Sequence, residues 1–289
     1  MMEIDLHTHS FFSDGLYSPI QLLLKAKEKG CVLFSITDHD TIQGNIVLSS
    51  HLQDYSLTYI NGVELSILIN NKKFEVLGYN YDIHSLKLRE KLMQLQNGRI
   101  NRMTKIIEKL NDIGILVTLD EVKKEAAGAE SIGRPHVARV MVKKGYVSSV
   151  KEAFDRYLAV GRPAYVKRRA LSLKEAINLI IQAKGVAVVP HPLIFENKDL
   201  IKLEEILDMY VEAGAIGVEV YYDYKSNMPA LPEKIVKKAT KFMEQYCKKR
   251  GLIMRVGSDY HGDKGEVCNA KTPEEVKENL VNFFTKSNE

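Results

Sequence analysis

The 289-residue sequence has no tryptophan, only three cysteines and no long apolar run. No stretch approaches the roughly 20 apolar residues of a membrane-spanning helix, and the first residues lack the basic and apolar regions of a secretory signal. Cys31, Cys247 and Cys268 are far apart and odd in number, which argues against a disulfide framework and against a cysteine-type zinc site. We therefore expect a cytoplasmic protein without a membrane partner.

Charge is unevenly distributed along the chain. The formal net charge is +4, but residues 99 to 167 alone hold 14 lysines and arginines against 8 aspartates and glutamates. Such an excess is typical of a surface that binds an anionic substrate. A lysine-rich, solvated helix surface would give the same count, so charge alone does not decide between the two.

Helix and strand patterns alternate near both ends of the chain. "SPIQLLLKAKEKG" has Ser18 as a candidate N-cap, Pro19 at the first helical position and Gly30 after the helix end. It leads to the apolar run "CVLFSI", and later helix patterns lead to "VAVVP", "IGVEVYY" and "LIMRVGSD". "LTYINGVEL" is expected to be a strand ending at Glu64, and "SILINNKKFEVLGY" a hairpin turning at residues 70–71. Such apolar strands, each preceded by a helix, predict a parallel sheet covered by helices.

The pattern changes in the middle of the chain. Residues 84–114 are typical of one long helix, and shorter helix patterns follow to residue 164 without a convincing strand. We therefore expect an α/β barrel-like domain formed by residues 1–97 and 165–289, interrupted by a small all-helical insertion of residues 98–164.

Five of the eight histidines stand at or just after predicted strand ends, together with five carboxylates. The ten residues are His7, His9, His39, His191 and His261 with Asp14, Asp38, Asp40, Glu64 and Asp259. One histidine at a strand end is usually a hydrogen-bonded structural residue. Because α/β barrels build their active sites from the loops after their strands, five of them with carboxylates indicate a metal site.

The types of side chain indicate the metal and the reaction. Imidazoles and carboxylates without thiolates suit manganese, iron or zinc. The candidate ligands are too many for one ion, so we expect two or three divalent ions. Such clusters convert a bound water to hydroxide and neutralise a phosphoryl group, which predicts hydrolysis of a phosphate ester.

Four segments, "DLHTHSFFSDG", "ITDHDT", "NGVELS" and "VGSDYHG", resemble in this order the four motif regions of the PHP (polymerase and histidinol phosphatase) superfamily. The resemblance covers most of the chain. It implies a distorted (β/α)7 barrel with a trinuclear metal site at the carboxyl ends of its strands, and a metal-dependent phosphoesterase activity.

The same resemblance implies ligands for three ions. The first ion would be bound by His7, His9, Glu64 and Asp259. The second would be bound by Glu64 as a bridge, by His191 and by Glu75. The third would be bound by Asp14, His39 and His261. Relatives usually have a histidine where Glu75 stands, so three outcomes remain open: a carboxylate ligand, a binuclear site, or a simple salt bridge.

The segment "SIGRPHVARVMV" resembles a segment of PHP phosphatases that act on nucleoside 3',5'-bisphosphates, a group also associated with 5'-to-3' exonuclease activity on short RNA. Arg134 offers a planar fork to phosphate oxygens, and His136 could donate to the same phosphate. Both stand at a predicted helix start, where free N–H groups favour anions. We expect both to bind substrate. Arg99 and Arg102 are weaker candidates, which a solvated helix face explains equally well.

We therefore expect a phosphatase that uses a metal-activated hydroxide to remove the 3'-phosphate of nucleoside 3',5'-bisphosphates. The expected catalytic residues are Asp14, His39, His136, His191, Asp259 and His261. His136 is also a candidate proton donor to the leaving oxygen. Glu219 is expected to support a metal-bound histidine, whereas Tyr221 and Tyr222 are better explained by packing.

Three alternatives remain open. A histidinol-phosphate phosphatase would share the fold and the metals, but a basic insertion fits its small cationic substrate poorly. A 5'-to-3' exonuclease is compatible with a basic helical segment, although the absence of tryptophan limits it to short oligoribonucleotides and argues against long duplex nucleic acid. The chain could also be a metal-stabilised regulatory or binding module without activity. The oligomeric state is left open.

Overall fold

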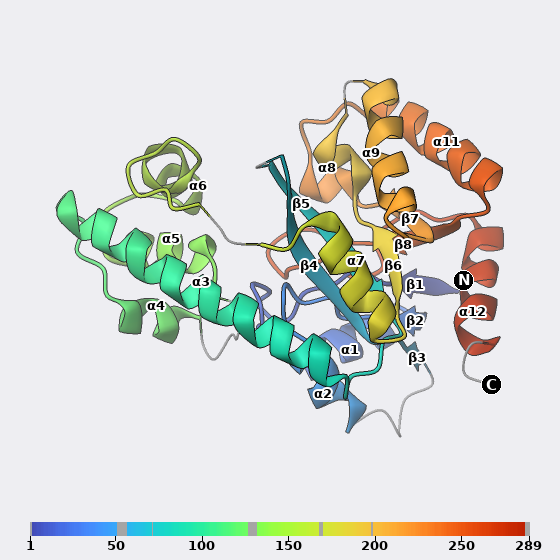
Figure 1. Ribbon diagram of the computed structural model, residues 1–289, viewed down its shortest axis with the longest axis horizontal. Coiled ribbons are helices and arrows are strands. Elements are labelled where there is room, and N and C mark those ends of the chain that lie inside the picture. The colour runs from blue at the N-terminus through green and yellow to red at the C-terminus, as the bar shows by residue number, and fades with distance from the viewer. Residues whose placement is uncertain are drawn as a thin grey trace.

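The strands form two sheets, shown in Figure 1. The computed structural model describes residues 2–50, 57–70, 72–126, 132–167, 170–197 and 199–286. The smaller sheet is parallel and consists, in spatial order, of β1 (Glu3–Asp5), β2 (Cys31–Phe34) and β3 (Thr58–Tyr59). The chain between these strands forms α1 (Pro19–Glu28) and α2 (Gln43–Ser49). As predicted, Ser18 caps α1, because its Oγ accepts a hydrogen bond from the Gln21 backbone N–H.

The larger sheet combines both strand directions. In spatial order it contains β4 (Gly62–Ile69), β5 (Lys72–Tyr79), β6 (Val186–Val189), β7 (Gly217–Tyr222) and β8 (Ile253–Gly257). β4 and β5 form the predicted hairpin, β5 is also antiparallel to β6, and the last three strands are parallel. One detail of the prediction was wrong, because Glu64 is the third residue of β4 and not a strand end.

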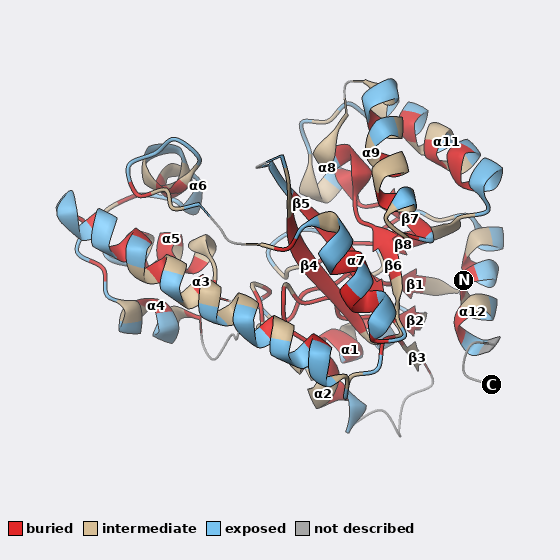
Figure 2. Ribbon diagram, in the orientation of Figure 1, coloured by how far each residue is buried: buried red, intermediate tan, exposed pale blue. Residues whose placement is uncertain are grey.

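Helices cover the larger sheet and turn their buried faces toward it, as Figure 2 shows. They are α7 (Leu173–Gln182), α9 (Leu200–Glu212), α11 (Glu233–Arg250) and α12 (Glu274–Lys286). Two single-turn helices, α8 (Pro192–Phe195) and α10 (Tyr224–Asn227), follow β6 and β7. Fully buried side chains such as Ile177, Leu207 and Phe284 join these helices to the strands in one hydrophobic core.

The strand ladder does not close into the predicted barrel. The two sheets are joined by isolated bridges between Thr8 and Tyr260 and between His39 and Glu64. Beside these bridges, Asp40 and Asp259 have φ values of 53° and 55°. A strand ladder cannot continue through the left-handed region. The chain therefore has an α/β fold of two adjoining sheets, with turns where a closed barrel would have continuous strands.

Residues 98–164, which we call the helical segment, contain no strand among their described residues. The elements are α3 (Leu86–Asp112), which begins before the segment, α4 (Leu119–Glu125), α5 (Arg134–Lys143), α6 (Val150–Ala153) and the π-helical turn η2 (Phe154–Leu158). Their apolar side chains form a cluster of their own, which includes Met103, Val137 and Leu158. Figure 1 shows α4, α5 and α6 beside the far half of α3, to one side of the sheets. The domain boundaries stay a prediction.

Among the described helices, none combines the length and the apolar character that a membrane crossing requires.

Candidate metal centre

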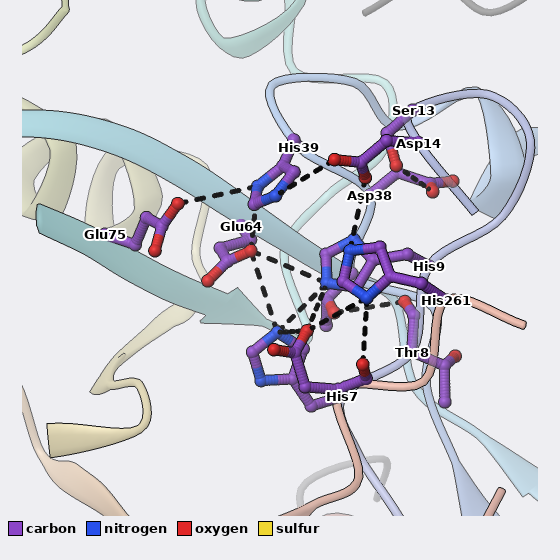
Figure 3. A network of polar contacts seen from close by, with 12 residues as sticks. His7, Thr8, His9, Ser13, Asp14, Asp38, His39, Glu64, Glu75 and His261 are labelled. Carbon is purple, nitrogen blue, oxygen red and sulfur yellow. Dashed lines mark hydrogen bonds and ion pairs between the residues drawn. The ribbon is translucent and has the colours of Figure 1, made fainter. Parts of the chain in front are cut away.

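The nine predicted metal ligands gather at one end of the strands, and Figure 3 shows most of them. The loops that follow strands carry His7 and His9 after β1, His39 after β2, His191 after β6, and Asp259 and His261 after β8. Asp14 lies further along the loop after β1, whereas Glu64 and Glu75 project from within β4 and β5. The centre therefore stands where parallel strands present their carboxyl ends.

The nine side chains form four overlapping groups, and in each group one ligand atom per residue lies within 4.8 Å of the others. The groups are His9, Asp14, His39 and His261; His7, His9 and Asp259; His7, Glu64 and His191; and His39, Glu64 and Glu75. Four side chains each belong to two groups, namely His7, His9, His39 and Glu64. Such an arrangement is typical of clusters in which neighbouring ions share ligands.

Glu64 occupies the centre of these groups. Its Oε1 lies 3.0 Å from Nε2 of His191, and its Oε2 lies 2.8 Å from Nδ1 of His39. The same Oε2 lies 3.7 Å from Nε2 of His7 and 3.5 Å from Nε2 of His9. One carboxylate thus faces four imidazoles, which is the position that the sequence predicted for a bridging ligand.

His7, His9 and Asp259 meet on the other side of the centre. Nε2 of His9 lies 3.1 Å from Nε2 of His7 and 3.0 Å from Oδ1 of Asp259. Nε2 of His7 lies 3.4 Å from the same oxygen. Two imidazole nitrogens and one carboxylate oxygen therefore converge on a single point.

The donor set fits divalent metal ions. The side chains of His7, His9 and Glu64 are at most 1% exposed, so their polar atoms have lost water and need other partners. Nδ1 of His9 and Nδ1 of His191 are buried without a hydrogen-bond partner in the described structure. Imidazoles and carboxylates without thiolates suit manganese, iron or zinc. The described residues thus give buried, incompletely paired donors of the type that these ions require.

Glu75 forms the salt bridge that was one of the outcomes left open, and it also faces the candidate ligands. Its Oε1 forms an ion pair with Nζ of Lys73 at 2.5 Å. The same carboxylate faces the centre, with Oε2 3.5 Å from Nε2 of His191 and Oε1 3.9 Å from Nδ1 of His39. A salt bridge and a position beside the candidate ligands are therefore compatible in this fold.

The carboxylates and imidazoles of the centre shift one another's pKa values strongly. Burial by itself would raise the pKa of Asp14, but the positive charges on His39 and His261 outweigh it and hold that pKa well below its usual range. Burial would lower the pKa of His261, and Asp14 and Asp259 instead raise it to about 10. Carboxylates and protonated imidazoles therefore stabilise one another here. A divalent cation would supply the same positive charge in place of the protons.

Glu219 holds two candidate ligands at once. Its Oε1 lies 2.9 Å from Nδ1 of His7, and its Oε2 accepts a hydrogen bond from the backbone N–H of His191 at 2.7 Å. Gly257 leaves the space for this contact, because a Cβ there would lie 2.2 Å from Oε1 of Glu219 and 2.3 Å from Cβ of His7. The predicted contact between Glu219 and a histidine is confirmed. Such contacts fix the orientation of a ligating imidazole.

Three supporting contacts escaped the sequence analysis. Tyr222, which we expected to serve packing, donates from its hydroxyl to Oδ2 of Asp259 at 2.7 Å. Asp38, which stands at a strand end like the ligands, instead accepts hydrogen bonds from Ser10 and Ser13 and thereby fixes the loop after β1. Asp40 is paired with Arg99. The spacing of Asp38 and Asp40 around His39 indicates that they are near the site but not which partner each takes.

Arg134 and His136 lie in the first turn of α5 and belong to none of the four groups. Arg134 donates from Nη1 to the Leu158 carbonyl at 2.9 Å, and its guanidinium lies over the Phe154 ring at 5.2 Å. Nδ1 of His136 accepts a hydrogen bond from the Gly133 N–H at 3.0 Å. Burial, with the positive charge of Arg139, lowers the pKa of His136 to about 4, and the charge of Asp14 opposes this shift. His136 is therefore close enough to the centre to feel one of its carboxylates.

Comparisons with known proteins agree with this geometry. The 3',5'-nucleoside bisphosphate phosphatase of Chromobacterium violaceum is 30% identical over 90% of this chain and 88% of its own length. The 5'-3' exoribonuclease of Haemophilus influenzae is 31% identical over 89% of each chain. Both relatives therefore match along almost the whole sequence.

Solved structures support the same fold. An amidohydrolase from Chromobacterium violaceum with bound sulfate and no metal superposes with a TM-score of 0.81 at 26% identity, covering 95% of this chain and 93% of its own. A metal-dependent phosphoesterase from Bifidobacterium adolescentis shares the fold with a TM-score of 0.79 at 23% identity, over 97% and 95% of the two chains. Residues 5–213 match the PHP domain family. The chain belongs to this family and is a phosphoesterase.

Proposed function

We propose that this phosphoesterase removes the 3'-phosphate of nucleoside 3',5'-bisphosphates. The observation that carries the proposal is the position of α5, in whose first turn His136 lies near enough to the candidate metal centre for the charge of Asp14 to act on its pKa, with Arg134 two residues before it. A substrate with two phosphates needs two anion sites, and the centre together with this helix end offers them. The relative from Chromobacterium violaceum, which is named for this activity, matches the chain across both parts.

We propose that the centre holds two or three divalent ions of manganese, iron or zinc. The residues that would hold them are His7, His9, Asp14, His39, Glu64, Glu75, His191, Asp259 and His261. When bound, such ions supply a nucleophile at neutral pH and positive charge for the phosphoryl oxygens. Glu64 supports this assignment because it belongs to two of the four groups, one with His7 and His191 and one with His39 and Glu75.

Three of these side chains are fixed by neighbours within the chain, which supports a catalytic role. Asp14 faces Nε2 of His261 at 3.3 Å and Nε2 of His39 at 3.8 Å. Asp259 is held by the Tyr222 hydroxyl, and the His191 backbone by Glu219. Fixed side chains keep the reacting phosphate in a single orientation, which is the main contribution of a protein to phosphoryl transfer.

Arg134 and His136 would bind the substrate's second phosphate. The contacts of Arg134 with Leu158 and Phe154 fix the plane of its guanidinium, whose other nitrogen donors are then available to an anion. His136 is neutral at neutral pH because its pKa is about 4, and its Nδ1 accepts from Gly133, so its Nε2 carries the proton. We propose that His136 donates a hydrogen bond to the substrate as a neutral imidazole, which makes a role as a charged proton donor to the leaving oxygen less favourable.

We further propose that the helical segment is an insertion that contributes to substrate binding. The separate hydrophobic cluster of this segment supports the proposal. Cys31, Cys247 and Cys268 form no disulfide, which is compatible with the reducing cytoplasm that the sequence predicts.

A second candidate is a 5'-to-3' exonuclease acting on short oligoribonucleotides. Two observations favour it. The relative from Haemophilus influenzae is named for such an activity, and the helical segment is basic. Both reactions place one phosphate at the metal centre and a second phosphate nearby, so the same geometry could serve either substrate.

A panel of substrates tests the proposal. The wild-type protein with manganese is given adenosine 3',5'-bisphosphate, a 5'-phosphorylated tetraribonucleotide and histidinol phosphate, and phosphate or mononucleotide release is measured. We expect the highest kcat/KM for the bisphosphate. Faster release from the tetraribonucleotide would favour the exonuclease, and preference for histidinol phosphate would contradict both proposals. Failure with all three would favour a regulatory module.

A ligand variant tests the role of the centre. His9→Ala is expected to lose roughly 100-fold or more in activity, because even supporting residues of metal sites typically contribute 10- to 100-fold. The matched control is Arg89→Met, since Arg89 is an exposed residue of α3. Wild-type turnover and metal content in His9→Ala would show that the assignment of the centre is wrong.

A further inference from the structure

Arg99 of α3 is buried and turned toward the candidate metal centre. Only 9% of the residue is exposed, so the solvated helix face that the sequence allowed is wrong at this position. Nε and Nη2 of its guanidinium both donate to Oδ2 of Asp40, at 3.0 and 2.5 Å. A buried arginine is costly unless its charge is paired. The pair with Asp40 therefore fixes where the helix meets the sheets.

Asp40 belongs to the backbone that carries two candidate ligands. It follows His39 directly, and its N–H donates to the Glu64 carbonyl at 3.0 Å. Its Oδ1 accepts from the Ser66 N–H at 2.8 Å. Its φ of 53° lies in the left-handed region, which is unfavourable for a non-glycine residue and persists only where contacts enforce it. Arg99 thus bonds to the turn that connects His39 with Glu64.

The other side of the Arg99 guanidinium approaches the beginning of α5. A methyl group placed on Gly133 would lie 3.9 Å from Nη1 of Arg99. Gly133 is the N-cap of α5, and its N–H donates to Nδ1 of His136. The guanidinium therefore lies between the turn of the metal centre and the helix end that presents Arg134 and His136. Figure 1 shows that α3, the helix that carries Arg99, runs from the sheets to the helices of the segment.

We propose that Arg99 is a positioning residue that sets the distance between the metal centre and the N-terminal end of α5. Because the two anion sites of the proposed substrate stand on these two parts, this distance determines which bisphosphates fit. The inference rests on the proposed function for its substrate. Arginine suits the role because its planar fork fixes direction as well as charge, which a lysine ammonium does not.

The first test compares two substrates in Arg99→Met. Adenosine 3',5'-bisphosphate needs both anion sites, whereas p-nitrophenyl phosphate needs only the metal centre. We expect kcat/KM for the bisphosphate to fall about 10- to 100-fold, chiefly through KM, because displacement of the beginning of α5 weakens one of the two anion sites. The value for p-nitrophenyl phosphate is expected to fall several-fold at most. Equal losses for the two substrates, or loss of bound manganese, would overturn the proposal.

The conservative variant Arg99→Lys shows whether the role of Arg99 depends on the fixed direction of its hydrogen bonds or only on its positive charge. Arg99→Lys is expected to remain within a few-fold of Arg99→Met with the bisphosphate, since lysine keeps the charge but not the fork. Recovery to the wild-type KM would show that only the charge matters and would overturn the positioning role. Arg89→Met, on the exposed part of the same helix, is the matched control and should behave as wild type.

A second measurement does not depend on the nucleotide. Amide hydrogen exchange of residues 132–137 reports how firmly the beginning of α5 is held. We expect this exchange to be at least several-fold faster in Arg99→Met than in the wild type, while exchange in β7 and β8 stays the same. Unchanged exchange in residues 132–137 would overturn the inference. If the wild-type protein fails to hydrolyse the bisphosphate, the proposed function fails, and the exchange result still decides the positioning role.

Discussion

At the scale of single residues, the candidate ligands are held in place by neighbours that would not bind a metal themselves. Glu219 orients His7 and the backbone of His191, and Tyr222 donates to Asp259. These contacts satisfy buried polar atoms that would otherwise cost stability. They also leave the opposite side of each ligand directed toward the centre. The chemistry of the site therefore depends on residues one contact away from the candidate ions.

Tyr222→Phe tests one of these contacts. The change removes the hydroxyl that donates to Oδ2 of Asp259 at 2.7 Å and leaves the ring in place. We expect kcat/KM to fall by about 10-fold, because a hydrogen bond to a charged group contributes roughly 1.5–3 kcal/mol. The neighbouring Tyr221→Phe is the control, since its hydroxyl donates to Glu244, which is not a candidate ligand. Similar activity losses in the two variants would show that the Asp259 contact has no special role.

The sequence predicted which histidines and carboxylates converge better than it predicted the contacts that hold them, and the reason is physical. Histidines and carboxylates directly after apolar strands have few roles, so their positions are informative. A tyrosine at the end of a buried strand usually packs, and an arginine on a helix is usually solvated. The contacts of Tyr222 and Arg99 depend on partners 37 and 59 residues away. Spacing along one segment cannot reveal such partners.

At the scale of elements, local signals fixed the helix boundaries well. Ser18 caps α1 and Ser172 caps α7, each with a side chain at the third helical position that bonds back to the cap. α7 covers the β4–β5 hairpin, from which Glu64 and Glu75 project into the centre. The strand boundaries were less predictable. β4 runs five residues past the expected end at Glu64, because pairing with β5 extends it.

Ser172→Ala tests the capping of α7. Ser172 Oγ accepts from the Glu175 N–H, and the Glu175 carboxylate accepts from the Ser172 N–H at 2.8 Å. We expect the free energy of unfolding to fall by about 1 kcal/mol, with unchanged activity, as measured by denaturant unfolding and by phosphate release. Ser49→Ala is the control, because the hydroxyl of Ser49 bonds only to a carbonyl within α2. A loss in Ser172→Ala no larger than that of the control would contradict the capping role.

At the scale of the whole molecule, topology explains why distant motifs meet. The strands β1, β2, β6 and β8 point their carboxyl ends to the same side, so the loops after them converge although His7 and His261 are 254 positions apart in the chain (261 − 7). The positions of the histidines and carboxylates at strand ends predicted this convergence, and the family resemblance implied a distorted (β/α)7 barrel. The barrel was wrong in detail, because left-handed residues at Asp40 and Asp259 stop the ladder where the two sheets meet. The centre thus lies at the junction that a continuous ladder would have occupied.

This position predicts that metal binding stabilises the fold. The candidate ligands come from both sheets, so ions that bind them would add links across the junction at which the strand ladder is interrupted. An ion present at 100 times its dissociation constant adds about 2.7 kcal/mol. Since about 1 kcal/mol shifts the Tm of a large domain by roughly 2 °C, we expect manganese to raise the Tm of chelator-treated protein by on the order of 5 °C.

The manganese-induced shift in Tm, measured in two variants, identifies where the ions bind. His9→Ala should lose most of the shift, because His9 belongs to two of the four groups. Arg89→Met should keep it, since this exposed side chain of α3 lies outside all four groups. A shift of equal size in His9→Ala would mean that manganese binds elsewhere on the protein. No shift in the wild type would mean that the junction of the two sheets is stable without ions, and the convergence of imidazoles and carboxylates there would then need another explanation.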